Sequence, residues 1–376
     1  MGQEQAEGES PRVSRGALSS AVVLSVLLVF GSPVAGQLRD TVRASFPRSF
    51  TLIVLGAVAA IVVAAFVAAV ARIRDRRAVR YLALVGALAI GVLYARALRT
   101  GNPEVDAVET FHFVEYGVVT LLFYLAWRPL EDGSAFVLPL AAGTLVGILD
   151  EWVQWFVPLR VGEMRDVGLD VIAVGCGLLF GVGLVPPETW SVSVRPREKW
   201  RIAVAVLAVT VAFGGFFESV HLGQEIQDQS RNTFLSTYSQ DELQAADAER
   251  SQRWRADPPL VQRPLSREDH YLSEALWHVQ RRNRAWTAED WFTAWRENLI
   301  LETHFAAAID MPTYVSRAGL RWPPEQRVDA ANRTARMVGP YESDAAPYGI
   351  YTWPPLLLWA GLLGAAGVGL AVFFSR

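Results

Sequence analysis

Eight long apolar runs constrain the fold of this chain more than any other feature of its sequence. A helix that crosses a bilayer needs about 20 mostly apolar residues, and arginine side chains at the ends of a shorter run extend it by reaching the interface. The runs cover residues 17–36, 50–71, 81–95, 108–127, 133–155, 167–185, 202–217 and 351–374. We therefore predict an all-α, polytopic helical membrane protein with about eight spans.

Charged residues are concentrated in one block between the last two runs. Residues 219–352 hold 15 Arg and 19 Asp or Glu, whereas the whole chain is only 19% charged. Soluble domains have about 25% charged residues, so this block has the density of a soluble domain. We expect N-terminal spans in 1–79, a helical membrane domain in 80–186, a seventh span with its loop in 187–218, a mainly helical extracytoplasmic domain in 219–352 and a C-terminal span in 353–376.

Charge and cysteine content exclude other classes. A net charge of −3 provides no basic surface for nucleic acid. The single cysteine, Cys176, can form neither an internal disulfide nor a cysteine-rich metal site. We therefore expect no cofactor, no metal site and no nucleic-acid partner. Gly175 and Gly177 flank Cys176, and Gly143 and Gly147 lie in the preceding run; small residues in such positions favour close helix packing.

Basic residues in the short loops predict the orientation. Five arginines lie at positions 72, 74, 76, 77 and 80, and four basic residues lie at 195, 197, 199 and 201. With both loops in the cytoplasm, both chain ends are cytoplasmic and residues 219–352 are extracytoplasmic. We expect a multi-pass protein of the cell (inner or cytoplasmic) membrane. The first run has a second interpretation, because residues 34–36 resemble a signal-cleavage site; either interpretation places Gln37 outside.

Three of the predicted spans contain ionisable groups, each of which costs roughly 2.5–3.5 kcal/mol to insert. These and their polar neighbours are Glu109, His112, Glu115 and Tyr116 in the fourth span, Asp150, Glu151 and Gln154 in the fifth, Asp166 and Asp170 in the sixth, and Arg160 and Arg165 in the connecting loop. In the predicted topology all lie near the outer surface, at the level of an aromatic belt formed by Trp152, Trp155 and Phe156. We therefore predict one polar pocket, open to the outer leaflet or the outer surface.

The order and spacing of these residues resemble the VanZ-like membrane family over about residues 80–186. The resemblance rests on His112-Phe113-Val114-Glu115-Tyr116, on the stretch from Asp150-Glu151 through Gln154 and Phe156 to Arg160, and on Asp166-Val167 with the glycines from 175 to 181. The chain departs from the family at Asp170, where the family usually has asparagine. The extra carboxylate is expected to be protonated or to pair with Arg160 or Arg165.

The resemblance implies a cell-envelope role, since the family's namesake is associated with low-level teicoplanin resistance. We expect a membrane lipid or a lipid-linked envelope precursor as the partner. The shared depth of the polar groups gives a hypothesis about their roles. Its catalytic candidates are Asp150, Glu151, His112 and Glu115, and its binding candidates are Arg160, Gln154, Tyr116, Asp166 and Asp170. Asp150 or Glu151 would activate a nucleophile while Arg160 holds an anionic head group.

Two interpretations from other classes stay open. Buried ion pairs often add little stability but fix the register of helices, so the polar cluster is also explained as a scaffold in a structural or partner-binding protein. Carboxylates inside a membrane also serve small-solute or ion transport. A neutral isostere at Asp150 separates these interpretations, because it preserves hydrogen bonding but removes the charge.

Capping signals predict helices in the charged block. Ser239 precedes a run to about residue 255, residues 266–269 have the shape of a capping box before a helix to about residue 284, and residues 287–290 repeat that shape before a helix to about residue 308. Trp291 and Trp295 begin an apolar stripe on the last of these helices, and beyond Asp310 the chain is expected to be irregular. His270, His278, Glu302 and His304 are expected to have structural roles, because they match no metal-ligand spacing.

Overall fold

The computed structural model of the chain describes residues 13–97, 103–157, 160–188, 191, 193–255 and 270–375. It divides into two compact units, and each is described by itself. The first comprises Met1–Glu151, Met164–Gly214 and Gly361–Arg376, and the second comprises Trp152–Glu163 and Gly215–Ala360. The second unit contains the charged block 219–352.

Eight helices in the described residues are long and apolar enough to cross a membrane, which confirms the predicted all-α, multi-pass architecture. They are α1 (Arg15–Ser45), α2 (Phe50–Arg72), α3 (Arg77–Ala97), α4 (Pro103–Trp127), α5 (Ser134–Gln154), α6 (Met164–Leu184), α7 (Pro196–His221) and α13 (Pro355–Ser375). Each contains most of one predicted run. The first helix extends past residue 36, through the candidate cleavage site, with Pro33 inside it.

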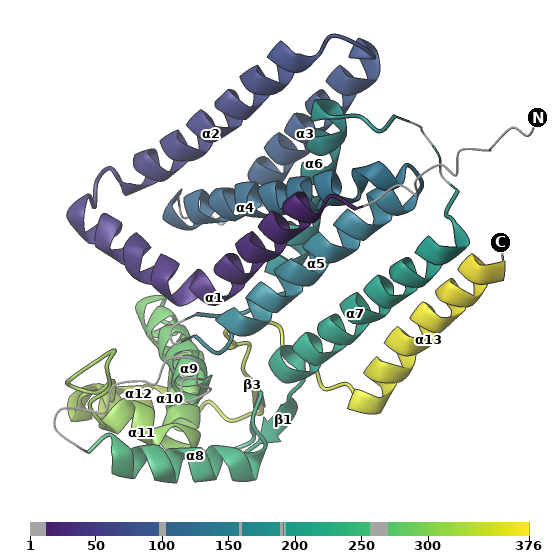
Figure 1. Cartoon of the computed structure of the whole chain (residues 1–376). Helices are drawn as coiled ribbons and strands as arrows, with labels where there is room; N and C mark the ends of the chain where they lie inside the picture. The colour runs from purple at the N-terminus through teal and green to yellow at the C-terminus, as the bar shows by residue number, and fades with distance from the viewer. Residues whose placement is uncertain are drawn as a thin grey trace, which may run out of the picture. The chain divides into compact units, whose positions relative to one another are not determined.

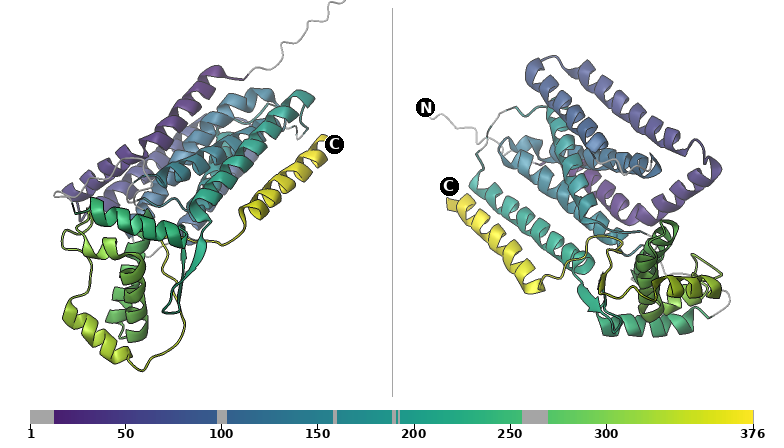
Figure 2. Two further views of the ribbon diagram at one scale, coloured as in Figure 1. Left: turned by 90° about the horizontal axis from the view of Figure 1, so that it is seen from below. Right: turned by 180° about the vertical axis from the view of Figure 1, so that it is seen from behind.

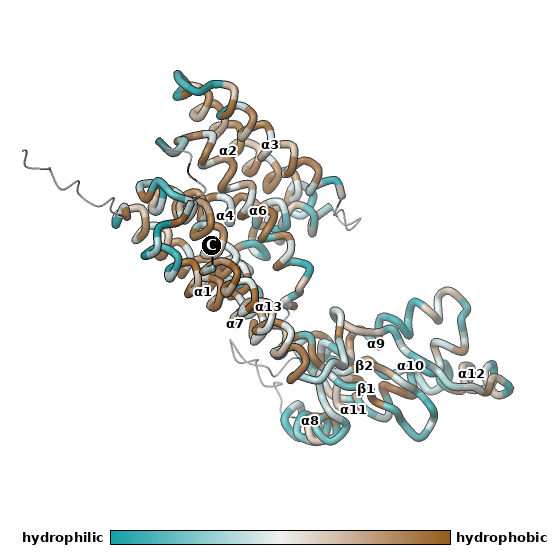
Figure 3. The backbone as a smooth tube through the Cα atoms, turned by 90° about the vertical axis from the view of Figure 1, so that its right-hand side faces the viewer, coloured by the Kyte–Doolittle hydropathy of each residue, from teal (hydrophilic) through white to brown (hydrophobic). Residues whose placement is uncertain are grey.

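The outward faces of these helices are apolar, as a lipid environment requires. Leu52 of α2 is 73% exposed and Leu82 of α3 is 72% exposed, the reverse of the pattern in a soluble protein. Helices suit this environment because their backbone groups are hydrogen-bonded within the segment. Figure 3 shows the apolar residues spread along α1–α7 and α13, and the polar residues gathered in α8–α12.

The core of the first unit is built on the contact between α4 and α6, against which α1, α2 and α3 also pack (Figure 1). Gly177 permits this contact, because a Cβ there would lie 2.4 Å from the Gly117 carbonyl oxygen. Gly143 has the same role between α5 and its neighbours, since its Cβ would lie 2.6 Å from Thr120 Oγ1. Close packing at small residues is confirmed at these positions, whereas a Cβ at Gly175 would meet nothing within 4 Å.

The helices α7 and α13 lie side by side in both views of Figure 2 (teal and yellow). Phe373 of α13 packs with Ile202 and Val206 of α7, and the Lys199 ammonium lies 5.6 Å from the centre of the Phe373 ring. These contacts join the last span to the seventh although about 140 residues separate them.

The second unit contains a small sheet that the sequence did not predict. Strand β1 (Gln224–Gln227) pairs antiparallel with β2 (Asn232–Ser236), and β3 (Tyr341–Glu342) pairs parallel with β2. The helices of this unit are α8 (Gln240–Arg253), α9 (His270–Thr287), α10 (Trp291–His304), α11 (Ala306–Asp310) and α12 (Pro324–Thr334). Phe234 of β2 is buried in the main core with Tyr271 and Phe305, so the sheet closes one side of the helical packing.

The predicted helix ends in this unit are right in one case and wrong in another. Ser239 forms a capping box with Glu242 at the start of α8, as predicted. Residues 266–269 lie outside the described residues. Thr287 ends α9 rather than opening the next helix, and Asp290 is the N-cap of α10, with its carboxylate accepting a hydrogen bond from the Thr293 amide. The chain beyond Asp310 is also not wholly irregular, because Pro324 opens α12 from its first turn.

Candidate functional site

One face of α4 carries three of the predicted site residues. His112 Nδ1 lies 3.3 Å from Glu115 Oε2, and the His112 ring stacks on the Tyr116 ring with the centroids 6.3 Å apart. Residues three and four positions apart share a helix face, so these contacts follow directly from the spacing. His112 and Glu115 are partly exposed, whereas Tyr116 is buried. The face therefore leads from an accessible imidazole to a buried phenol.

Tyr116 connects α4 to carboxylates on two other helices. Its hydroxyl donates a hydrogen bond of 2.6 Å to Asp150 Oδ2 on α5, and the buried Asp170 carboxylate on α6 interacts electrostatically with Tyr116 and Asp150. Asp150 and Asp170 are 4% and 5% exposed. A phenol donates one hydrogen bond and accepts another, so Tyr116 and Asp150 can share a proton across their hydrogen bond.

Gly147 of α5 brings its helix close to Asp170. A Cβ at this position would lie 2.8 Å from Asp170 Cβ and 3.0 Å from Asp170 Oδ2. Any larger residue would therefore displace the carboxylate. Within the described part of the chain, Asp170 Oδ2 has no hydrogen-bond partner, and an unbonded buried oxygen is costly unless it has a role.

Arg165 is paired at the start of α6. Its guanidinium contacts the Glu109 carboxylate of α4 through two nitrogens, at 3.2 Å and 3.4 Å, and lies 3.9 Å from Asp166 Oδ1. The guanidinium is 40% exposed and its fork geometry suits carboxylates and phosphates.

Tyr94 of α3 belongs to this cluster, although the sequence did not indicate it. It is 8% exposed, its ring packs on Phe113 with the centroids 5.2 Å apart, and it interacts electrostatically with Glu109, Asp166 and Asp170. The only available signal was a polar aromatic residue near the end of an apolar run. We call Tyr94, Glu109, His112, Glu115, Tyr116, Asp150, Arg165, Asp166 and Asp170 the polar cluster.

The other predicted site residues continue along the chain from Asp150. Glu151 is 4% exposed and ends this segment of the first unit. Gln154 and Arg160 belong to the second unit, where Arg160 Nη2 donates a hydrogen bond of 2.5 Å to Gln154 Oε1. The polar cluster of the first unit therefore contains all the predicted site residues except Glu151, Gln154 and Arg160.

The second unit has buried charges of its own, centred on Glu297 of α10. Its carboxylate accepts hydrogen bonds from His278 at 2.6 Å, Tyr341 at 2.6 Å and Ser343 at 2.5 Å. Burial by itself raises the pKa of Glu297, but these hydrogen bonds outweigh it and hold the pKa below the ordinary glutamate value. The buried residues of α10 include polar groups such as Glu297 together with Ile300 and Leu301, whereas Trp291 and Trp295 of the predicted stripe are only partly buried.

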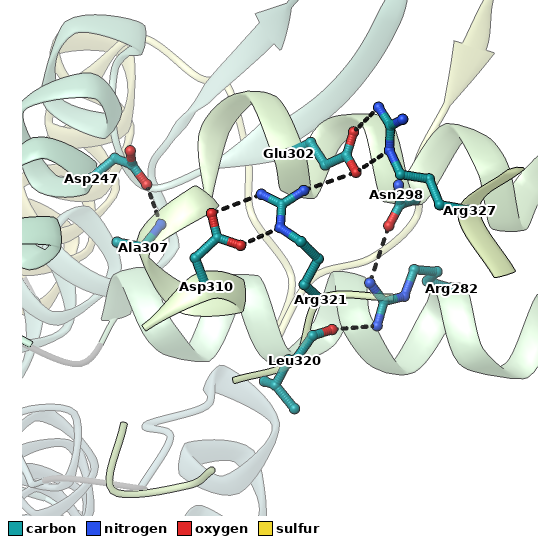
Figure 4. Close-up of polar contacts among 9 residues, drawn as sticks. All are labelled: Asp247, Arg282, Asn298, Glu302, Ala307, Asp310, Leu320, Arg321 and Arg327. Carbon is teal, nitrogen blue, oxygen red and sulfur yellow. Dashed lines mark hydrogen bonds and ion pairs between the residues drawn. The ribbon is translucent and has the colours of Figure 1, made fainter. Parts of the chain in front are cut away.

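The remaining ionisable groups of the second unit hold helices and loops together. Figure 4 shows Arg321 bonded to both Glu302 and Asp310, and Arg327 bonded to Glu302. Arg282 bonds Asn298 at 3.2 Å and the Leu320 carbonyl at 2.8 Å, and burial lowers the pKa of Arg282 to about 10. These ion pairs and hydrogen bonds are typical of contacts that stabilise a fold.

The histidines of the second unit have separate partners. His270 Nε2 lies 2.8 Å from the Trp155 carbonyl, His278 bonds Glu297, and His304 lies 4.0 Å from Asp228. No group of three or more His, Cys, Asp or Glu residues in the described ranges has an arrangement that could hold a metal ion. The chemistry of these residues is therefore that of individual hydrogen-bonded pairs.

The chain matches no protein-family model, no curated protein and no solved structure. The polar cluster can transfer a proton between Tyr116 and Asp150, and Arg165 can bind an anion if it exchanges Glu109 for it.

Proposed function

We propose that this protein is a VanZ-like integral membrane protein that binds or acts on a cell-envelope molecule at the outer leaflet, with a role in glycopeptide (teicoplanin-type) resistance. In this proposal both termini are cytoplasmic and residues 219–352 are extracytoplasmic, as the distribution of arginines favours. Tyr116, Asp150 and Asp170 form the acid–base group, His112 and Glu115 lead protons to it, and Arg165 is the anion-binding arginine.

The observation that supports the proposal is the buried Tyr116–Asp150 hydrogen bond between two membrane helices, beside a second buried carboxylate, Asp170, on a third helix. Each ionisable group in a span costs roughly 2.5–3.5 kcal/mol on insertion scales. A scaffold needs only one hydrogen bond to join two helices, and the Tyr116–Asp150 bond supplies it. The second carboxylate adds repulsion to the site, which is typical of a group kept for proton transfer.

A scaffold remains the second candidate, and the close packing at Gly147 favours it. Gly147, which leaves room for the Asp170 side chain, also lets α5 pack closely against α6. Buried polar contacts of this kind fix helix register even when they add little stability. In this candidate the hydrogen bonds matter and the charges do not.

Asp150→Asn separates the two candidates, because an amide oxygen still accepts the Tyr116 hydrogen bond but cannot take its proton. We expect expression of the full chain in a bacterial host to raise the teicoplanin concentration that inhibits growth. We expect Asp150→Asn, Asp170→Asn and Tyr116→Phe each to abolish that increase at unchanged protein level in the membrane.

The matched control is Thr210→Val in α7, which removes a polar group from another membrane helix. The Thr210 hydroxyl bonds the Val206 carbonyl of its own helix, and its loss should leave resistance unchanged. Full resistance in Asp150→Asn at a normal protein level would contradict the acid–base role and leave the scaffold. If the unaltered chain gives no resistance, the envelope role falls as well.

A further inference from the structure

An apolar groove lies in the first unit between α2, α3, α4 and α6. It has a volume of about 330 Å³, and its walls include Val58 and Phe66 of α2, Leu88 of α3, and Val114 and Leu121 of α4. Volumes of roughly 300–1,000 Å³ are typical of small-molecule sites. The charges of the polar cluster do not line its length, so its walls suit hydrocarbon.

The groove begins beside the polar cluster. Tyr94 and Thr110 line one end of it, Tyr94 packs on Phe113 of α4, and Glu109, which bonds Arg165, precedes Thr110 in α4. The other end on α4 is marked by Leu121. The groove is therefore polar and charged at one end and apolar along the rest of its length.

The length of the groove matches one leaflet of a bilayer. From Thr110 to Leu121 the rise of 1.5 Å per residue gives about 16 Å along α4, close to half of the roughly 30 Å hydrocarbon thickness. A lipid chain has the same polarity, with a charged head at the surface and hydrocarbon to the midplane. The groove thus matches one chain in both length and polarity.

Glycine keeps the floor of the groove open. Gly117 lines it, and a Cβ at Gly117 would meet nothing within 4 Å. On the facing helix, a Cβ at Gly177 would lie 2.4 Å from the Gly117 carbonyl oxygen. The two helices therefore touch at their backbones, and the side of Gly117 that faces the groove is open space.

We propose that the groove holds one hydrocarbon chain of a phosphate-bearing lipid whose head group is bound by Arg165. This inference rests on the proposed function and names the class of molecule that the polar cluster receives. The Arg165 side chain is 40% exposed and bonds Glu109, the residue before Thr110 of the groove lining. Phosphate replaces Glu109 as the partner of its guanidinium, since bidentate contacts form with either group. The bound head group then lies beside Tyr94, next to Tyr116 and Asp170.

Photo-crosslinking of the full chain tests this proposal. The protein is reconstituted in phosphatidylcholine nanodiscs, and the probe is dodecyl phosphate with a diazirine near the end of its chain. We expect saturable labelling of peptides that contain Val114, Leu121 and Cys176, which line the groove. Unlabelled dodecyl phosphate should compete at concentrations at least about tenfold lower than dodecanol, because the alcohol lacks the charge that Arg165 binds.

Two substitutions provide the matched comparison. Gly117→Leu fills the groove from a position where a Cβ fits, and it should lower the labelling at least about tenfold. Gly175→Leu is the control, since a Cβ at Gly175 also meets nothing within 4 Å but this residue is outside the groove lining. Leu121→Trp is a second groove-filling variant, in case Gly117→Leu does not fold. Arg165→Gln should remove the preference for dodecyl phosphate over dodecanol.

Three results would overturn the proposal: labelling that does not saturate, labelling that dodecanol displaces as well as dodecyl phosphate, or full labelling of both folded groove-filling variants. The first result would show that the groove contains only bulk lipid. The experiment is independent of resistance. Saturable labelling together with a resistant Asp150→Asn variant would support lipid binding in the groove and contradict the acid–base role. Labelling that does not saturate, together with a sensitive Asp150→Asn variant, would contradict lipid binding in the groove alone.

Discussion

At the scale of single residues, the absence of a side chain positions the polar cluster as much as the charges do. Gly147 leaves room for the Asp170 carboxylate, because a Cβ there would lie 2.8 Å from Asp170 Cβ. We expect Gly147→Ala to destabilise the membrane unit by about 1–3 kcal/mol, the usual cost of forcing extra atoms into a packed core. Thermal unfolding of the purified protein in detergent measures this loss.

The control for that substitution is Gly168→Ala on α6. A Cβ at Gly168 meets nothing within 4 Å, so this change alters only the helix propensity, which favours alanine by about 0.5–1 kcal/mol. The two variants should therefore shift the unfolding midpoint in opposite directions. A midpoint for Gly147→Ala at or above that of the unaltered chain would show that α5 adjusts freely and that the glycine does not position Asp170.

The second residue-scale prediction concerns pH and the buried Glu297. Its pKa is depressed in the folded state, so it contributes stability above the pKa of the unfolded chain, and that stability is lost as pH falls below about 4.5 through the folded pKa. Burial raises the pKa of Glu274, which gives a contribution of the opposite sign. A variant that alters Glu297 alone is therefore needed.

We expect Glu297→Gln to cost about 3 kcal/mol near pH 7, because it leaves His278 and Tyr341 without their ionised partner. The stability of this variant should also fall less steeply below pH 4.5 than that of the unaltered chain. Hydrogen exchange of α10 peptides, measured by mass spectrometry from pH 7 to below pH 4.5, gives both the loss of stability and its dependence on pH. Glu342→Gln is the exposed control in β3, and equal acid slopes in all three proteins would disprove the assignment.

At the scale of the element, an arginine in a loop that predicts the topology also donates hydrogen bonds to the free carbonyls at the end of a neighbouring helix. Arg80 lies near the N-terminus of α3. Its guanidinium donates hydrogen bonds to the carbonyls of Gly183 at 2.9 Å and Leu184 at 2.6 Å, at the C-terminus of α6. The last carbonyls of a helix lack partners within it, and a cation there also offsets the helix dipole. The side chain is buried, so these bonds are shielded from water.

We expect Arg80→Gln to destabilise the first unit by about 2 kcal/mol, the worth of a hydrogen bond from a charged donor. The Val185 amide, which bonds the Gly181 carbonyl at 2.8 Å, should then exchange faster in the nanodisc-embedded protein. Arg72→Gln is the control, because Arg72 ends α2 and is exposed. Equal exchange of the Val185 amide in both variants would indicate that Arg80 sets the orientation of the spans but does not stabilise the end of α6.

Capping residues show what a sequence can and cannot predict about an element. Ser239 was predicted correctly because its partner Glu242 is local and its contacts lie within four residues. Thr287 and Asp290 compete for the next helix start, and the chain uses Asp290 because α9 continues through Thr287. Strands of four, five and two residues have too few positions to show alternation, and the pairing of β3 with β2 joins segments about 100 residues apart.

At the scale of the whole molecule, hydropathy predicts the spans well because the membrane requires continuous apolar helices. Spacing also predicts the shared face of His112 and Tyr116. Tyr94 and the groove were not predicted, because they depend on which helices become neighbours. The partner of Arg165 was missed for the same reason, since Glu109 is 56 residues away in the sequence.

Contacts at the two ends of the first unit support the predicted alternation of the spans. Arg76 donates hydrogen bonds to the carbonyls of Pro187 at 2.7 Å and Glu188 at 2.9 Å, so the loops after α2 and α6 lie at one end. Arg165 and Glu109 join the starts of α4 and α6. The helix α6 begins at the end where Arg165 contacts Glu109 and finishes at the end where Arg76 contacts Pro187 and Glu188. The polar cluster and the arginine-rich loops therefore lie at opposite ends of the unit.

This separation predicts a labelling pattern for single cysteines placed in a Cys176→Ser background. Met164→Cys and Asp344→Cys, at exposed positions, should react with a membrane-impermeant maleimide applied to intact cells. Asp75→Cys and Glu188→Cys, also exposed, should react only after permeabilisation, because the proposed topology places the arginine-rich end in the cytoplasm. Reaction of Met164→Cys and Glu188→Cys from the same side would contradict the crossing of α6 and the outer-leaflet position of the polar cluster. Reversed labelling of all four would retain the fold but place the cluster at the cytoplasmic leaflet, where an outer-leaflet substrate cannot reach it.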